Sequence, residues 1–440
     1  MFVMLDHTPI GITNWRDSNQ PFFIKDSDRF GHIYVLGKTG VGKSTLLLNM
    51  AISDIEKGKG LCVIDPHSDV VSTLLDCIPK QRIKDVIYFN PLDNKYPIGF
   101  NPLKSVSPQF HSLVASGLIA VFKKIWADSW GVRMEYILRF SILTLLEYPD
   151  ATLLDINPLL TNQDFRKDVL TYVHNEHTRS FWLNEYTKYT KSHQIESISP
   201  ILNKAGIFHS NTILRNMFGQ PKQKFRISHI MDTNKIMLVS LSKGELGEDI
   251  SSLIGSILIT TFQLATAYRA TQPEELRNPF YLYIDEAHSF ISHSTVDILA
   301  EARKYKLSLF LSHQYIEQLH EKIRSAIFGN VGTFIAFRVG AQDAHMLEKE
   351  LYPIFSSEDL IKLPRFGMYI KLMIDGATSF PFSAYTLPHK LPDVSYKDEV
   401  IMYSQKMYGN EKSKVEQQIK DRYLNNTKQV GIPNLFSRIL

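Results

Sequence analysis

The run Gly37–Thr45, which reads Gly-Lys-Thr-Gly-Val-Gly-Lys-Ser-Thr, is the feature that most constrains how this chain can fold. An apolar run at 32–36 precedes it, and a helical apolar pattern at 46–51 follows it. Strand, glycine-rich loop and helix in this order fit G-x-x-x-x-G-K-[ST], in which backbone N–H groups surround phosphate oxygens. A chance glycine-rich turn before a helix is the alternative. We predict a phosphate-binding loop with these contacts: Gly37, Thr39, Gly40, Val41, Gly42, Lys43, Ser44 and Thr45.

Two side chains of this loop are expected to act on the ligand directly. The Lys43 ammonium can reach the β- and γ-phosphates of a nucleoside triphosphate, and the Ser44 hydroxyl can ligate Mg²⁺. The N-terminus of the following helix adds the positive end of its dipole.

The composition describes a soluble globular chain of more than one domain. Its 440 residues exceed one ordinary core, and 44% apolar with 21% charged residues is usual for a folded protein. The net charge of +4 does not by itself identify a polyanionic partner. The two cysteines, Cys62 and Cys77, argue against a disulfide framework and for a reducing compartment. The longest uncharged segment, 250–268, carries many Ser and Thr residues, so we predict a helix buried against a sheet rather than a membrane span.

The order of patterns predicts an α/β fold interrupted by helices. Apolar runs at 32–36, 60–66 and 85–91 alternate with helical patterns, which is typical of a parallel sheet covered on both faces. Further strands are predicted at 235–240, 281–286, 307–312 and 333–337, with a closing hairpin over 367–385. The predicted domains are a strand segment (1–31), the first part of the α/β domain (32–107), an inserted all-helical domain (108–226), the second part of the α/β domain (227–392) and a polar helical tail (393–440).

An acidic pair ends one of the predicted strands. Asp285 would hold the Mg²⁺ shell, and Glu286 would polarise the attacking water as a general base. The carboxyl ends of parallel strands meet at one sheet edge, so both carboxylates are expected near the phosphate loop. Asp65, at another strand end, is the competing acid and would be a secondary contributor.

Two further polar residues complete the predicted site. Gln314 follows the strand 307–312 and can orient water or sense the γ-phosphate; the alternative is a polar loop residue. Arg303 can reach a transferring phosphate across a subunit boundary, or it is only a cation at a helix C-terminus. Arg338 is the second choice for the arginine role.

With these residues the chain resembles the HerA–FtsK superfamily of ring ATPases, and most closely its conjugative coupling-protein branch, the TraG/TraD-like type IV secretion ATPases. The similar segments are His32–Thr45, Gly60–Asp69, Trp130–Arg139, Tyr281–His288, Arg303–Gln314 and Phe337–Ala344. The resemblance implies a RecA-like P-loop ATPase domain with an inserted all-α domain. It also implies ATP and Mg²⁺ at the interfaces of a homohexamer, with Arg303 acting in trans, Gln314 as its companion, and DNA in the central channel.

Two departures from the branch stand out. The family's Asp-Pro-His-Gly-Asp segment has Ser68 in place of glycine. Membrane-spanning helices usually precede the phosphate loop in coupling proteins, whereas the roughly thirty residues before this loop contain no such span. We therefore expect a cytoplasmic protein without its own membrane anchor.

The leading hypothesis is an ATP-hydrolysing ring motor that translocates DNA. The predicted insertion has 14 Lys/Arg against 10 Asp/Glu, an excess equal to the net charge of the chain, although such charges usually form a solvated face. Lys243 and the segment Gln314–Arg324 are candidate DNA contacts. The alternatives are a nucleotide-dependent scaffold ring for a nuclease or defence effector, and a type IV secretion ATPase that acts on protein. Candidate partners are a relaxase, a secretion channel or a nuclease.

Overall fold

The computed structural model describes residues 6–104 and 106–428, and its contacts divide the chain into two compact units. The first unit takes in the described residues up to Phe89 together with Arg226–Ser404, and the second takes in Asn90–Phe225 and the chain from Gln405 onward. The predicted insertion, 108–226, falls almost wholly in the second unit. That unit also contains 90–107 and the last described helix, so its limits differ from the predicted ones.

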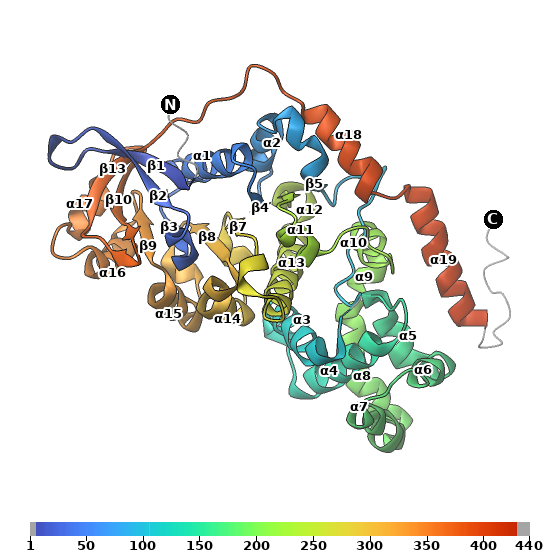
Figure 1. The fold of residues 1–440 in the computed structure, drawn as a ribbon. Coiled ribbons are helices and arrows are strands. Elements are labelled where there is room, and N and C mark those ends of the chain that lie inside the picture. Colours follow the sequence, from blue (N-terminus) through green and yellow to red (C-terminus); the bar gives the residue numbers. More distant parts are fainter. Residues whose placement is uncertain (1–5, 105, 429–440) are drawn as a thin grey trace. The chain divides into compact units, whose positions relative to one another are not determined.

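One eleven-stranded sheet runs through the first unit (Figure 1). Its strands lie in the order β2 (Gln20–Lys25), β1 (His7–Thr13), β13 (Phe382–Thr386), β10 (Gly367–Lys371), β9 (Thr333–Ala336), β3 (Ile33–Leu36), β8 (Leu307–His313), β7 (Phe280–Ile284), β4 (Gly60–Asp65), β6 (Ile236–Ser240) and β5 (Val86–Phe89). Neighbours from β9 to β5 pair in parallel, and neighbours from β9 to β2 pair antiparallel. The predicted α/β class is confirmed.

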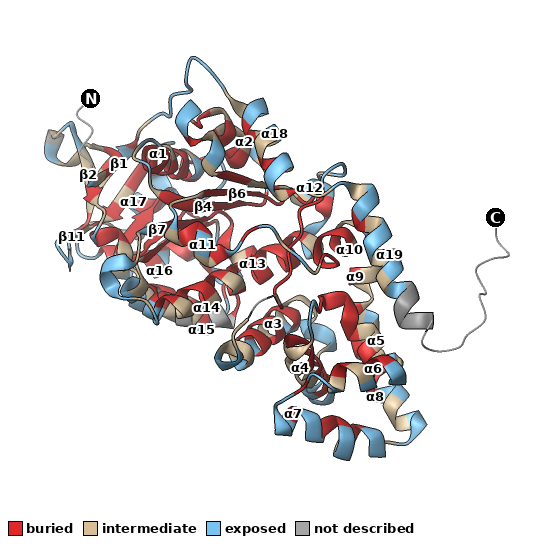
Figure 2. Ribbon diagram, turned by 45° about the vertical axis from the view of Figure 1, so that its right-hand side comes forward, coloured by how far each residue is buried: buried red, intermediate tan, exposed pale blue. Residues whose placement is uncertain are grey.

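Helices cover both faces of this sheet, and its central strands are accordingly buried along their whole length. Helices α1 (Lys43–Glu56) and α2 (Asp69–Asp76) lie on one face, and α13 (Glu248–Arg269), α14 (His293–Glu301) and α15 (Glu321–Asn330) lie on the other (Figure 2). Every residue of β3, β4 and β7 is buried. The unit is completed by α11 (Ile227–Asp232), α12 (Lys243–Leu246), α16 (Ala341–Leu351), α17 (Ser357–Lys362), most of α18 (Lys397–Tyr408) and the short hairpin β11 (Met373–Ile374) and β12 (Ala377–Thr378).

Helix α13 contains the uncharged segment and is a core helix, as predicted. Among the described residues it is the one helix long and apolar enough to cross a membrane, and 72% of its most apolar window is buried inside the protein. Its polar side chains are satisfied within the fold, since Ser251 Oγ donates to the Leu241 carbonyl and Ser256 Oγ donates to the Phe290 carbonyl, both at 2.8 Å. Gly255 permits a close approach, because a Cβ there would lie 2.3 Å from the Phe290 ring.

A buried ion pair between Arg29 and Asp54, joined by a hydrogen bond to Tyr283, links α1, which begins with the predicted lysine, to β7, which the predicted acids follow. Arg29 donates to both carboxylate oxygens of Asp54, at 2.7 and 2.8 Å, and to Tyr283 Oη at 2.6 Å. Its guanidinium also lies 3.7 Å from the centre of the Tyr281 ring. Burial opposes the charge on Asp54, but Arg29 beside it holds the pKa of that carboxyl below its usual value. The pair therefore fixes α1 relative to β7, the strand that directly precedes Asp285.

The second unit is helical where it is described, apart from one isolated bridge between Ile98 and Gly409. Its helices are α3 (His111–Ile125), α4 (Val132–Glu147), α5 (Ile156–Thr161), α6 (Gln163–Leu170), α7 (Glu176–Ser180), α8 (Lys191–Ala205), α9 (Ile207–Ser210), α10 (Thr212–Phe218) and α19 (Lys412–Lys428). An aromatic cluster forms its core: Trp182 is fully buried and donates to Thr144 Oγ1 at 2.7 Å, and Phe181 stacks on Phe140 at 4.3 Å.

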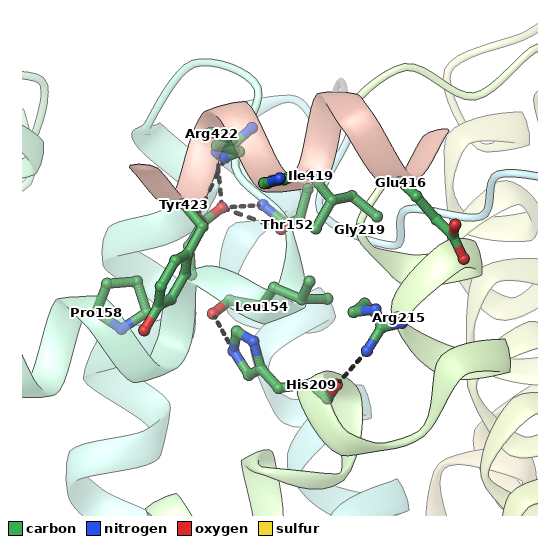
Figure 3. A pocket seen from close by; sticks show the side chains of 12 residues that line it. Thr152, Leu154, Pro158, His209, Arg215, Gly219, Glu416, Ile419, Arg422 and Tyr423 are labelled. Atoms are coloured by element: carbon green, nitrogen blue, oxygen red, sulfur yellow. Dashed lines mark hydrogen bonds and ion pairs between the residues drawn. The ribbon is translucent and has the colours of Figure 1, made fainter. Parts of the chain in front are cut away.

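Helix α19, from the predicted tail, packs on this helical unit through hydrogen bonds from Arg422 and a few apolar contacts (Figure 3). Arg422 Nη2 donates to the buried Asp155 Oδ2 at 2.7 Å, and Arg422 Nε donates to Oδ1 at 3.3 Å. Val415 is buried, and Ile419 lies against Gly219. A cavity of about 430 Å³, lined in part by Glu416, Ile419 and Tyr423 of this helix, lies beside the Arg422 contact.

Candidate active site

The phosphate-binding loop leaves β3 at Leu36 and enters α1 at Lys43, as predicted. Gly40 and Gly42 have φ values of 75° and 128°, a region that residues with a Cβ rarely adopt. Gly42 is also crowded, because a Cβ there would lie 3.0 Å from both the Phe337 and the Phe366 rings. The glycines are therefore required by the loop's backbone path.

Lys43 lies over the loop and faces the acids. Its Nζ donates to the Gly37 carbonyl at 2.6 Å and to the Lys38 carbonyl at 3.0 Å. Burial lowers the pKa of this ammonium, and the nearby charges of Glu286 and Asp285 oppose that shift. An anionic ligand would favour the charged form in the same way, so the lysine is placed to bind phosphate.

The acidic pair sits at the end of β7, where the chain turns sharply. Asp285 Oδ1 accepts from Ser312 Oγ and, at 3.0 Å, from the Glu286 backbone N–H. Glu286 is in the left-handed region (φ 47°, ψ 49°), which is uncommon for a residue other than glycine. Burial raises the pKa of Asp285, and the Glu286 charge raises it further. A divalent cation beside Asp285 would favour its ionised form.

Gln314, at the end of the neighbouring strand β8, contacts this pair. Its Nε2 donates to Glu286 Oε1 at 2.7 Å, and His288 Nδ1 lies 3.5 Å from Glu286 Oε2. The side chain of Gln314 is thus directed at the acid rather than at a surface loop. The hydrogen bond therefore joins Gln314 to the carboxylate that we predict to polarise water.

The end of β4 supplies a second acidic segment to the same region. Asp65 accepts from the backbone N–H groups of His67, at 2.8 Å, and Val71, at 3.0 Å, so its carboxylate caps the turn that leads into α2. Burial raises its pKa. Ser68 occupies the left-handed region at φ 71°, and its hydroxyl accepts from Ser240 Oγ at 2.6 Å. The residue that replaces the family's glycine therefore retains a glycine-like backbone.

These elements enclose a cavity of about 900 Å³ in the first unit. Predicted site residues line it from three elements, namely Thr39, Gly40, Gly42, Lys43, Ser44, Thr45, Asp285, Glu286 and Gln314. Gly37 and Val41 belong to the loop but do not line the cavity, and Val41 is buried in the core.

One wall of this cavity was not predicted from the sequence. Arg365, Phe366, Thr386, Pro388 and His389 all line it, although they match no motif. They flank the predicted hairpin 367–385, whose strands β10 and β13 pair antiparallel, and they reach the site because β10 also pairs with β9. The hairpin was predicted, but its place in the sheet depends on pairing with a strand outside it.

The other predicted cations lie elsewhere. Arg303, in the 3₁₀ turn after α14, is exposed and does not line the cavity. Arg338 is exposed as well, and only its carbonyl meets the loop, accepting from the Lys38 N–H at 2.9 Å. Lys243, a candidate DNA contact, donates to Ser289 Oγ at 2.7 Å.

The donor set fits Mg²⁺ carried by a nucleotide rather than a resident metal. Within 6–104 and 106–428 no group of three or more His, Cys, Asp or Glu residues is arranged to hold a metal ion. Ser44 and Asp285 line the cavity together, and Mg²⁺ is usually bound through one or two protein oxygens plus phosphates and waters.

The family of the chain follows from a sequence profile. The profile described as "Helicase HerA, central domain" matches residues 16–250, more than half of the 440 residues. The chain belongs to this HerA family. The matched range includes the phosphate loop and the β4 segment but ends before β7. No curated protein sequence gives a match.

Solved structures agree on the fold. The bacterial conjugative coupling protein TrwBdeltaN70 is similar with a TM-score of 0.61 and 14% identity, covering 84% of this chain and 88% of that chain. Plasmid coupling protein TrwB in complex with ADP and Mg²⁺ gives 0.61 at 15% identity, covering 89% and 92%. VirB4 of Thermoanaerobacter pseudethanolicus gives 0.58 at 14% identity, covering 89% and 98%. The HerA-family chain therefore has the RecA-like P-loop ATPase fold with a helical domain.

Proposed function

We propose that the protein is an ATP-hydrolysing ring motor that translocates DNA. The observation that carries the proposal is the contact of Gln314 with Glu286 in the cavity that Lys43, Ser44 and Asp285 also line. Hydrolysis of a nucleoside triphosphate uses a lysine that binds the phosphates, an acid that holds Mg²⁺ and residues that position the attacking water. This cavity contains two carboxylates, a lysine and a glutamine around the phosphate-binding loop.

Each residue has a distinct role in this proposal. Lys43 and the loop N–H groups bind the β- and γ-phosphates, and Ser44 and Asp285 hold Mg²⁺, which neutralises the developing charge. Glu286 takes the proton of the attacking water, and Gln314 keeps its carboxylate in place. Coupling protein TrwB has been solved with ADP and Mg²⁺ and with a non-hydrolysable ATP analogue, which supports the same ligands here.

The exposed position of Arg303 supports an assembly. An arginine that lies outside its own chain's cavity can serve the cavity of a neighbouring copy, where an arginine finger commonly accelerates phosphoryl transfer about 10³- to 10⁵-fold. We therefore propose a homo-oligomeric ring, a hexamer by family resemblance, with DNA in its channel and a cytoplasmic location.

The test measures both ATP turnover and movement of the protein along DNA. A triplex-displacement assay measures ATP-dependent tracking along DNA, with wild type, Lys43→Ala and the exposed control Lys390→Ala. We expect displacement by wild type and Lys390→Ala and none by Lys43→Ala. ATP turnover without displacement would refute translocation and favour the scaffold ring or the protein-secretion ATPase. Unchanged turnover in Lys43→Ala would refute the site itself.

A further inference from the structure

The turn that follows Glu286 brings a second side chain to its carboxylate. Gln314 Nε2 donates to Glu286 Oε1 at 2.7 Å, and on the other side His288 Nδ1 lies 3.5 Å from Glu286 Oε2. The side chains of His288 and Glu286 are both mostly buried. The carboxylate that we propose as the general base therefore lies between an amide and an imidazole.

The backbone of this turn is held independently of the imidazole. The Ser289 N–H donates to the Glu286 carbonyl at 2.9 Å, and Ser256 Oγ, on α13, donates to the Phe290 carbonyl at 2.8 Å. These bonds fix the turn on both sides of His288. A replacement of the His288 side chain should therefore leave the turn in place.

The other ring nitrogen of His288 belongs to a chain of polar groups that ends at Lys243. His288 Nε2 lies 3.3 Å from Ser289 Oγ, and Lys243 Nζ donates to the same buried Oγ at 2.7 Å. Lys243 begins α12, after β6, and its backbone N–H donates to the Pro66 carbonyl at 2.9 Å. The nearest acid to the Lys243 ammonium is the exposed Glu248, at 3.9 Å. The ammonium of Lys243 is thus directed into the fold, toward the turn that carries Glu286.

The donors and acceptors along this chain give it a direction. An ammonium can only donate, so Ser289 Oγ accepts from Lys243 and its own proton is left to point toward His288 Nε2. In a neutral imidazole, the nitrogen that accepts carries no proton, so the ring proton is on Nδ1, which faces Glu286. Without Lys243, the hydroxyl can accept from Nε2–H instead, and a bare Nδ1 lone pair would then face the carboxylate.

We propose that His288 is a positioning residue for Glu286, and that Lys243 acts through Ser289 to set the tautomer in which His288 donates from Nδ1. The proposal rests on the proposed function, because it concerns the general base of that reaction. Hydrogen bonds at catalytic sites are often long before substrate binds, so a separation of 3.5 Å is expected to shorten with ATP in place.

Two consequences follow for the site. Gln314 and His288 hold one oxygen each of the Glu286 carboxylate, which has about four lone pairs in all, so lone pairs remain for the attacking water. Lys243 acts in hydrolysis, in place of the DNA contact that was considered from its sequence position.

Two replacements of His288 separate its ring nitrogens. Asparagine places an amide donor near the position of Nδ1, whereas the longer glutamine places one nearer to Nε2. Turnover without DNA gives kcat and KM, a labelled ATP gives the nucleotide affinity, and a labelled DNA duplex gives the DNA affinity. The variants are His288→Asn, His288→Gln, Lys243→Ala and the double variant His288→Asn with Lys243→Ala. Lys390→Ala is the matched lysine control, since Lys390 is exposed and does not line the cavity.

We expect His288→Gln and Lys243→Ala each to lower kcat about tenfold, because a catalytic group that is slightly misplaced loses up to about 10²-fold in rate. KM and ATP affinity should stay within about threefold, which also reports a folded site, because Lys43 and the phosphate loop are untouched. His288→Asn should stay close to wild type. An asparagine has no tautomer to set, so adding Lys243→Ala to it should cost nothing further.

Equal losses in His288→Asn and His288→Gln would overturn the proposal, and so would a full tenfold further loss in the double variant. Weaker DNA binding by Lys243→Ala with DNA-free turnover intact would overturn it in favour of a DNA contact. Unchanged turnover in Lys43→Ala is a separate outcome and would instead refute the proposed function.

Discussion

Replacing Glu286 by Gln tests the general base with the smallest possible change. The side chain is 6% exposed, and its Oε1 accepts from Gln314 Nε2 at 2.7 Å. An amide of the same shape can still accept that hydrogen bond through its oxygen, so we expect the site to keep its geometry. The amide cannot take a proton from water, as the carboxylate can.

The expected fall in the rate of hydrolysis follows from the loss of this one proton acceptor. Removing a positioned general base typically lowers a rate by about 10²- to 10⁴-fold, which corresponds to roughly 2.7–5.4 kcal/mol in the activation barrier. ATP affinity should fall little, since Lys43 and the loop are untouched. The Glu286 charge also raises the pKa of Asp285, so its removal favours the ionised form of that metal ligand.

Phosphate release at saturating ATP measures the rate, and the fluorescence of a labelled ATP measures binding. Glu399→Gln, an exposed acid on α18, is the matched control and should behave as wild type. We expect Glu286→Gln to bind ATP within about threefold of wild type and to turn it over at least a hundredfold more slowly. Turnover within tenfold of wild type would refute the role of Glu286.

Three further substitutions test the role of Arg303, the backbone at Ser68 and the pair of Arg422 with Asp155. Arg303→Ala should bind ATP normally but lose about 10³-fold in turnover; when it is mixed into wild-type rings, activity strictly proportional to wild-type content would contradict shared sites. Ser68→Gly is tested in a Ser240→Ala background, in which the hydrogen bond between the two hydroxyls is already absent. It should stabilise the first unit by about 1 kcal/mol in urea unfolding, because glycine adopts the left-handed backbone at position 68 without the steric cost of a Cβ. A loss of stability would show that the backbone there is not strained. Arg422→Gln removes the two hydrogen bonds from the Arg422 guanidinium to the buried Asp155 carboxylate, so it should destabilise the helical unit by about 1.5–3 kcal/mol, as measured by unfolding followed by tryptophan fluorescence. Adding Asp155→Asn should recover part of that loss, and full additivity of the two changes would argue against the pair.

Much of the α/β architecture could be predicted from local patterns. Buried parallel strands are apolar along their length, so β4 and β7 stand out, and the polar residues that end them are those placed at the sheet's carboxyl edge. The phosphate loop and the Asp285–Glu286 pair were found for this reason. Gln314 was found as a strand-end residue, and its contact with Glu286 could only come from the structure.

Other features depend on contacts far apart in the chain. Arg365 and Thr386 flank the predicted hairpin 367–385, and they reach the cavity because β10 joins the sheet beside β9, a pairing that no short pattern specifies. Helix α19 was predicted as a polar tail because its pattern is almost wholly polar, yet it packs on the helical unit, where Val415 is buried and Arg422 donates to Asp155. The role that we propose for Arg303 depends on a second copy of the chain, so a single chain does not contain the cavity that Arg303 would serve.

The central claim is that hydrolysis at the Lys43 site drives work on DNA. The most direct measurement is the ATPase rate of a size-resolved oligomer with no DNA, with single-stranded DNA and with double-stranded DNA, at several salt concentrations. We expect oligomer-dependent turnover that DNA stimulates, with a stimulation that falls steeply as salt rises, because binding to the phosphate backbone is electrostatic. A rate that neither kind of DNA changes at any salt concentration would contradict it.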